Sequence, residues 1–170
     1  MPRPIRLYVQ AITRLNLWLF RLAAALMLLI VPAMMAEVIS RYVFHSPTVW
    51  GMELAVLLFG PYFLLGGPYL LHVGGHVNMD LIRSRMAPRT GRRVDIFNQL
   101  VILFFCGVML YYATPLVIQS IEYRETTFSA WNPPLWPYKI AVPLAVLLLG
   151  LQSLAELARI CARRDDGSQA

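Results

Sequence analysis

Charged side chains are scarce in this chain: Asp, Glu, Lys and Arg make up only 14% of its 170 residues, whereas 58% are hydrophobic. Soluble domains carry about 25% charged residues, so this shortage excludes an ordinary soluble protein. Cysteine is scarce as well. Cys106 and Cys161 are the only two, and their spacing fits no disulfide framework, redox pair or metal motif. Both thiols are predicted to pack between helices.

Enzyme motifs are also missing. The sequence contains no nucleophile elbow, no phosphate-binding loop and no cluster of carboxylates inside an apolar run. His72 and His76 are four residues apart, but two glycines separate them and no third histidine lies near their level. They are therefore predicted to form hydrogen bonds at the membrane interface rather than to bind a metal or haem. We predict that the chain is not an enzyme and binds no cofactor or metal.

Long apolar runs are what the sequence has in abundance. A bilayer core about 30 Å thick needs about 20 apolar helical residues for each crossing. Four stretches meet this requirement, at residues 17–40, 49–71, 97–121 and 136–160. The predicted fold class is an all-α integral membrane protein, with one four-helix transmembrane domain over residues 1–164 and a polar tail at 165–170. Residues 1–16 are expected to lie on the membrane surface as a short basic arm.

Basic residues are rare at one end of these spans. Only Arg41, Arg124 and Lys139 lie there, whereas the other twelve precede or enter the first span, lie between spans two and three, or end or follow span four. This positive-inside bias predicts a multi-pass protein with both termini in the cytoplasm. The net charge of +6 is then a topology signal, and a nucleic-acid partner is not expected.

The segment after the second span changes character. Met79, Ile82 and Met86 recur at helical spacing among polar residues such as Asp80 and Arg83. This pattern predicts a short amphipathic helix on the cytoplasmic surface at residues 76–86. A solvated loop is the alternative.

Glycines recur at a regular interval along the second span. Glu53, Gly60, Gly67 and Gly74 are each seven residues apart, an interval that drifts by only about 20° on a straight helix, so all four share one face. Small residues let helix backbones approach closely in lipid. The face is expected to pack either within the bundle or against a partner subunit, and the pattern does not choose between the two.

Charged residues gather near the connection between spans one and two. Glu53 lies three residues inside Trp50, an interfacial residue type, and Arg41 lies at a similar level on span one. We predict a structural Glu53–Arg41 ion pair, with Glu37 nearby, that closes the outer end of the bundle. The alternative is that Glu53 binds protons or sodium directly.

The order of these features resembles the small membrane subunit of the tripartite ATP-independent periplasmic (TRAP) transporters, the DctQ-type family. The resemblance rests on Arg41 at the end of span one, on Trp50 and Glu53 at the start of span two, and on the stretch from His76 to Asp80. It continues at the entry to the last span, in Ser129, Pro134, Trp136 and Lys139. It covers about residues 15–160.

The resemblance implies a role that the residues alone do not show. In this family a small four-helix subunit braces a much larger membrane subunit, which carries the substrate and sodium sites. A periplasmic binding protein delivers the substrate, typically an organic acid. The chain is therefore expected in the bacterial inner membrane, as part of an ion-gradient-driven importer. The residues expected to be structural or to contact another subunit are Arg41, Trp50, Glu53, Gly60, Gly67, His76 and Asp80.

Two other functions fit four spans. A self-sufficient exporter would exchange protons for a cationic drug through a membrane carboxylate, and a haem- or quinone-linked subunit would serve a membrane enzyme. Such exporters place their acidic residue deep in the membrane, whereas Glu37 and Glu53 lie near one face. The importer subunit is therefore the preferred hypothesis.

Overall fold

The computed structural model describes residues 3–73 and 88–162. Over these residues the chain forms four long helices: α1 (Arg3–Tyr42), α2 (Gly51–Val73), α4 (Pro88–Glu122) and α5 (Trp136–Ala162). Extended structure in this part of the chain is limited to an isolated bridge between Thr126 and Pro134. Each helix contains a segment long and apolar enough to cross a membrane. The predicted all-α fold of four membrane-spanning helices is confirmed, and the chain is a multi-pass membrane protein.

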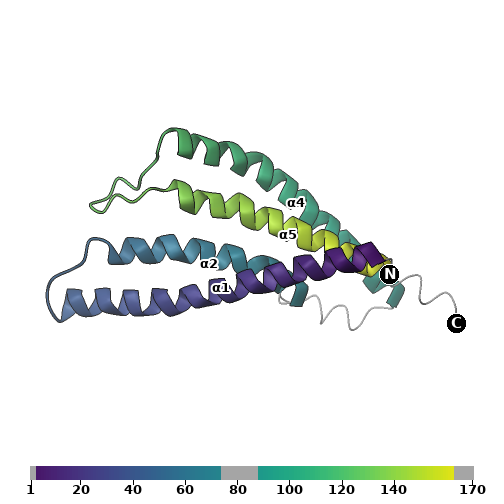
Figure 1. Cartoon of the computed structure of the whole chain (residues 1–170), viewed down its shortest axis with the longest axis horizontal. Coiled ribbons are helices and arrows are strands. Elements are labelled where there is room, and N and C mark those ends of the chain that lie inside the picture. Colours follow the sequence, from purple (N-terminus) through teal and green to yellow (C-terminus); the bar gives the residue numbers. More distant parts are fainter. Residues whose placement is uncertain (1–2, 74–87, 163–170) are drawn as a thin grey trace.

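The helices form two antiparallel hairpins, α1 with α2 and α4 with α5 (Figure 1). Both connections, residues 43–50 and 123–135, lie at one end of the bundle, which we call the loop end. The start of α1 and the last turns of α5 lie at the opposite end, the termini end. Helix α5 is central, because it packs against α4, α2 and α1. The two hairpins are therefore joined mainly through α5.

Buried residues recur every seven positions along α1. Val9, Asn16, Ala23, Ile30 and Glu37 are each at most 4% exposed, and the rest of the helix is exposed or half-buried. A seven-residue repeat keeps one line of side chains against a neighbouring helix when the two supercoil. The seven-residue pattern noted in the second span is thus accompanied by one in α1, where it marks the packing line.

The first turns of α1 belong to the bundle. The helix begins at Arg3, Val9 is buried, and the Tyr8 hydroxyl donates a hydrogen bond to the Leu151 carbonyl oxygen of α5 at 3.1 Å. The prediction of a separate surface arm was wrong over residues 3–16, because this segment continues into the first span as one helix and contacts α5.

Helix α2 runs without a break through Pro61 and Pro68. A proline inside a helix leaves a backbone carbonyl without its usual donor, which is tolerated in a membrane where neighbouring protein covers the site. Pro68 is fully buried, in agreement with this requirement. The amphipathic helix predicted at residues 76–86 lies outside the described residues, as does Gly74.

Candidate functional site

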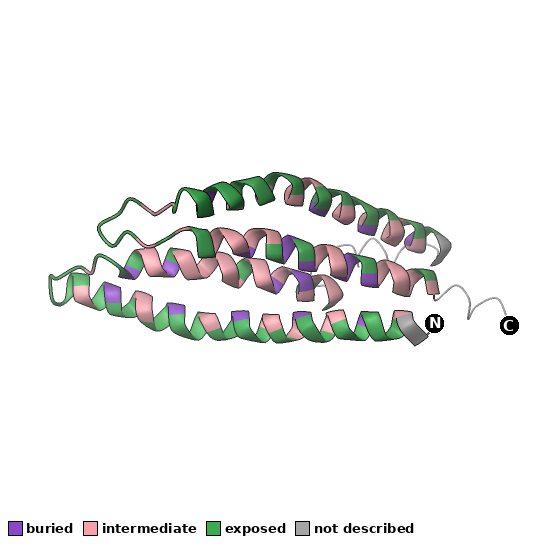
Figure 2. Ribbon diagram, turned by 45° about the horizontal axis from the view of Figure 1, so that its top comes forward, coloured by how far each residue is buried: buried purple, intermediate pink, exposed green. Residues whose placement is uncertain are grey.

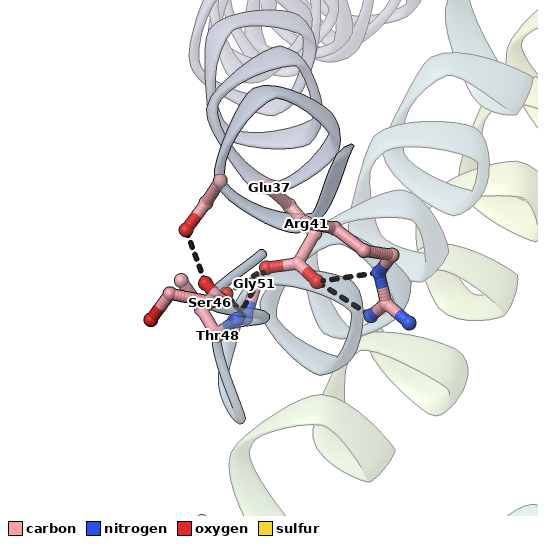
Figure 3. Close-up of polar contacts among 6 residues, drawn as sticks. Glu37, Arg41, Ser46, Thr48 and Gly51 are labelled. Carbon is pink, nitrogen blue, oxygen red and sulfur yellow. Dashed lines mark hydrogen bonds and ion pairs between the residues drawn. The ribbon is translucent and has the colours of Figure 1, made fainter. Parts of the chain in front are cut away.

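Glu37 is the centre of a polar cluster at the loop end (Figure 3). Glu37 follows a long apolar stretch of α1, and its carboxylate side chain is buried, at 3% exposure. Its Oε1 accepts hydrogen bonds from Arg41 Nη2 at 2.5 Å and from Arg41 Nε at 3.2 Å. Its Oε2 accepts from the backbone N–H of Thr48 at 3.1 Å and from the Thr48 hydroxyl. The carboxylate therefore joins the end of α1 to the connection that leads into α2.

Thr48 extends this contact to α2. Its hydroxyl accepts a hydrogen bond from the Gly51 N–H at 3.2 Å, which caps the first turn of α2 as threonine does at helix N-termini. Gly51 is buried, and a Cβ atom there would lie 2.7 Å from Thr48 Oγ1 and 2.8 Å from Glu37 Oε2. A side chain at residue 51 would therefore collide with the cluster. We call Glu37, Arg41, Thr48 and Gly51 the hairpin clasp.

The predicted Glu53–Arg41 ion pair was wrong. Arg41 pairs with Glu37, four residues earlier on the same helix, a spacing that brings side chains together on one helix face. Glu53 Oε2 instead accepts a hydrogen bond from the Ser129 hydroxyl at 2.7 Å. Glu53 thus ties the start of α2 to the loop of the other hairpin.

The loop that carries Ser129 is held in place at its tip and at its base. At the tip, the Ser129 hydroxyl accepts a hydrogen bond from Asn132 N–H at 2.9 Å. At the base, Leu135 N–H donates to the Glu125 carbonyl oxygen at 2.9 Å. Lys139 Nζ donates to the Glu125 carboxylate, and this hydrogen bond lowers the pKa of the Glu125 carboxyl from its usual value. The loop therefore offers Glu53 a fixed partner.

A second polar cluster joins three helices toward the termini end. Asn16 Nδ2 of α1 donates to Gln152 Oε1 of α5 at 2.8 Å, and both residues are buried. Gln152 Nε2 donates to Glu156 Oε1 at 3.1 Å. The same oxygen lies 2.7 Å from His72 Nδ1 of α2 and 3.2 Å from Arg159 Nη1. These five residues, the termini-end network, link α1, α2 and α5 by hydrogen bonds of the kind that hold helices together in lipid.

His72 has two possible partners within this network. Its Nδ1 is 2.7 Å from Glu156 Oε1 and 3.0 Å from Arg159 Nη1. A guanidinium only donates, so a protonated Nδ1 bonds to Glu156 and an unprotonated Nδ1 bonds to Arg159. The hydrogen-bonding role predicted for His72 is confirmed. Among the described residues, no group of three His, Cys, Asp or Glu side chains is placed to bind a metal.

Helix α4 is attached to α5 by smaller contacts. The Ser153 hydroxyl donates to Gln99 Oε1 at 2.7 Å, and both residues are buried. Cys106 is buried beside Gly150. A Cβ atom added at Gly150 would lie 3.6 Å from the Cβ atom of Cys106. The prediction that both thiols pack between helices is confirmed for Cys106 and was wrong for Cys161, which is exposed near the end of α5.

Residues 30–163, which include the last third of α1 and all of the other three helices, match the family described as "Tripartite ATP-independent periplasmic transporters, DctQ component". The chain belongs to the DctQ family. It is thus a subunit from a family of transporters. The resemblance drawn from the sequence is confirmed, and the exporter and the haem- or quinone-linked enzyme subunit gain no support.

A relative of this DctQ-family chain is the "Sialic acid TRAP transporter permease protein SiaT" of Haemophilus influenzae (strain 86-028NP). The two are 34% identical over 95 residues, which make up 56% of this chain and 15% of the relative. The match therefore spans only a small part of a much longer permease protein.

The remaining predicted contact residues of the DctQ-family chain have different surroundings. At Gly60 an added Cβ atom would overlap the ring of Tyr138 in α5, whereas at Gly67 it would meet no atom within 4 Å. Trp50, just before α2, is 41% exposed. Gly60 thus packs within the chain, and Gly67 and Trp50 are left partly open. His76 and Asp80 lie outside the described residues.

Sequence reasoning missed two residues that the fold brings into these clusters, Asn16 and Thr48. Asn16 lies just before the first predicted span, so nothing marked it as buried. The role of Thr48 depends on Glu37 reaching it across the connection, which the sequence does not reveal. Gln152 did carry a signal, because a polar side chain inside a spanning helix usually faces other protein.

Proposed function

We propose that this chain is the small membrane subunit of a TRAP-type importer and that it braces a large membrane subunit during uptake of an organic acid. The observation that carries the proposal is the DctQ match over residues 30–163. In this proposal an ion gradient drives uptake, the large subunit binds sodium and substrate, and a periplasmic binding protein delivers the substrate. The chain itself carries no cofactor and catalyses no reaction.

The extent of the match to the relative supports a large partner. The matched residues account for 15% of a protein named as a permease. Most of that permease protein therefore lies outside the part that resembles this chain. A large membrane subunit, acting together with this chain, would supply that remaining part.

The engagement of the membrane carboxylates supports a bracing role. Glu37 is bonded to Arg41 and Thr48, Glu53 to Ser129, and Glu156 to three side chains of the termini-end network. A carboxylate that carries an ion across a membrane must exchange that ion with solvent, whereas these three are occupied in holding helices together. The ion-carrying role considered for Glu53 is therefore not part of the proposal.

The basic residues support an orientation. Twelve of the fifteen come from the parts of the sequence that begin α1, join α2 to α4 or end α5, and the positive-inside bias favours the cytoplasm for the termini end. In the proposed orientation, within the bacterial inner membrane, the loop end faces the periplasm. The ordered loop 123–135 and the hairpin clasp then lie on the side where a binding protein would arrive.

Copurification and uptake test the proposal together. This chain is given an affinity tag and expressed from its own genome. A large multispan membrane protein should copurify with the tagged chain from detergent extracts. Deletion of the chain should abolish uptake of the organic acid that the copurified transporter carries. Recovery of the chain alone, or uptake unchanged by its deletion, would contradict the proposal.

A further inference from the structure

The loop-end half of α4 is poorly covered by its own chain (Figure 2). From residue 111 to residue 122, only Ala113, Val117 and Ser120 are other than exposed. Exposed apolar residues are expected on a membrane helix, because lipid surrounds them. The polar residues on this half of α4 require a different explanation.

A shallow, largely open groove lined by α4 alone lies along this half of the helix. Its lining includes Gly107, Tyr111, Pro115, Gln119 and Glu122, which recur at intervals of three or four residues and so share one helix face. At Gly107 an added Cβ atom would meet nothing within 4 Å. The missing side chain at Gly107 therefore leaves a depression in which a neighbouring helix could approach closely.

Three of the polar side chains in this groove find no partner in the part of the chain described here, whereas the Thr114 hydroxyl donates to the Leu110 carbonyl oxygen of its own helix. No described residue forms a hydrogen bond or ion pair with the side chains of Tyr111, Gln119 or Glu122. Tyr111 is 74% exposed and lies eleven residues before the end of α4, about 16 Å along the axis at 1.5 Å per residue. That depth is well below the interface, where tyrosine hydroxyls normally reach water. A hydroxyl at that depth calls for a partner in another molecule.

Helix α1 has an exposed surface of a different kind. Between Leu22 and Ala36 it contains only apolar residues, and Leu28, in the middle of this stretch, is 78% exposed. Lipid tails offer no hydrogen-bond partner, so a face of this kind suits them. The groove on α4 differs from it in both shape and polarity.

We propose that this groove is the docking site for a transmembrane helix of the large membrane subunit. This inference rests on the proposed function and names the surface through which the bracing acts. The occupant that fits has a hydrogen-bonding side chain opposite Tyr111 and a basic side chain opposite Glu122, since a carboxylate at the loop end attracts a positive charge. The close approach occurs at Gly107, and the Gln119 amide supplies a further hydrogen bond between these levels.

Photocrosslinking in the intact transporter tests the proposal. A photoreactive phenylalanine analogue replaces Tyr111 in the groove or, as a matched control, Leu28 on α1, and membranes are irradiated before purification. The expected result is an adduct between this chain and the large subunit from residue 111, at least fivefold more abundant than from residue 28. An adduct with a second copy of this chain, labelling of lipid alone, or equal yields at the two positions would overturn it.

Substitution of the glycine gives a second, independent readout. Gly107→Trp fills the groove and should reduce the copurified large subunit at least fivefold, whereas Leu28→Trp should leave it within twofold. The Tm of the purified Gly107→Trp chain should stay at the wild-type value, because the site is open. A large subunit that copurifies equally with both variants refutes the docking site and leaves the proposed function standing. If no large subunit copurifies even with the wild type, the proposed function itself fails.

Discussion

Glu37 and Glu122 are both carboxylates at the loop end of a membrane-spanning helix, yet their surroundings differ completely. Glu37 is buried and accepts hydrogen bonds from Arg41 and Thr48 of its own chain. Glu122 ends α4 beside an open groove, and no described residue bonds to it. A polar group that finds its partners within the chain stabilises the fold of that chain. A polar group that does not is available to another chain, and this contrast can be tested by substitution.

The largest effect on stability is expected from Glu37→Ala. The substitution leaves Arg41 and Thr48 without their common acceptor, and hydrogen bonds to a charged group contribute more to stability than bonds between neutral groups. The Tm of the purified chain in detergent should fall further than for any variant described below. Glu122→Ala is the matched control and should leave the Tm unchanged. Equal falls in the two variants would remove the basis of the comparison.

A pair of glycines tests the same contrast through shape. At Gly51 an added Cβ atom would lie 2.8 Å from Glu37 Oε2, whereas at Gly107 it would meet open space. Overpacking of this kind costs about 1–3 kcal/mol, so Gly51→Ala should lower the Tm. Gly107→Ala should leave the Tm equal or slightly higher, because alanine favours a helix more than glycine does. Thermal unfolding of both variants checks this, and a lower Tm for Gly107→Ala would mean that the groove is filled by the chain itself.

The termini-end network extends the contrast to the other end of the bundle. Gln152→Leu removes the hydrogen bond from Asn16, and interhelical bonds of this type contribute about 0.6 kcal/mol on average and up to about 1.7 kcal/mol. We expect a Tm fall smaller than that of Gly51→Ala. In a double-mutant cycle with Asn16→Leu, the two effects should add only in part, because both break the Asn16–Gln152 bond, whereas Gln152→Leu also removes the bond to Glu156. Gln119→Leu in α4 is the control and should leave the Tm of the isolated chain unchanged.

The smallest effect on stability is expected from Glu125→Gln, because the contact between Glu125 and Lys139 is partly exposed. The pKa of its carboxyl is lowered in the folded chain by the hydrogen bond from Lys139, so the unfolded chain binds a proton at a higher pH than the folded chain. The contribution to stability is therefore complete above a pH of about 4.5, the ordinary value for this group, and is lost as the pH falls through the lowered pKa.

A Tm profile against pH checks this expectation. Wild type should be slightly more stable than Glu125→Gln at neutral pH, and the difference should shrink to zero in acid. The matched control is Glu122→Gln, which should follow the wild-type profile throughout. If the Tm difference between wild type and Glu125→Gln persists in acid, the difference does not arise from the carboxylate charge.

The helices themselves were predictable, but their polar contacts were only partly so. Apolar runs of sufficient length have few alternatives to a membrane helix, because an unbonded backbone is too costly in lipid. The pairing of Arg41 was misjudged because a similar level along two helices does not fix the direction of a side chain around either helix. Residues four apart on α1, Glu37 and Arg41, face each other directly. Arg41 and Glu53, on two helices, need a particular rotation of both.

The sequence by itself determined that this chain crosses a membrane with four helices and belongs with the DctQ subunits, since apolar length and the order of charged residues are properties of the chain alone. Only the tertiary structure decided which polar side chains are partnered. Glu37 meets Thr48 because the connection folds back against the end of α1, and Asn16 meets Gln152 because α1 packs on α5. Tyr111 and Glu122 remain open because α4 packs mainly on α5 along its other side. Whether a polar side chain finds a hydrogen-bond partner depends on the rotation of the helices and on the distance between them. The sequence of one helix determines neither.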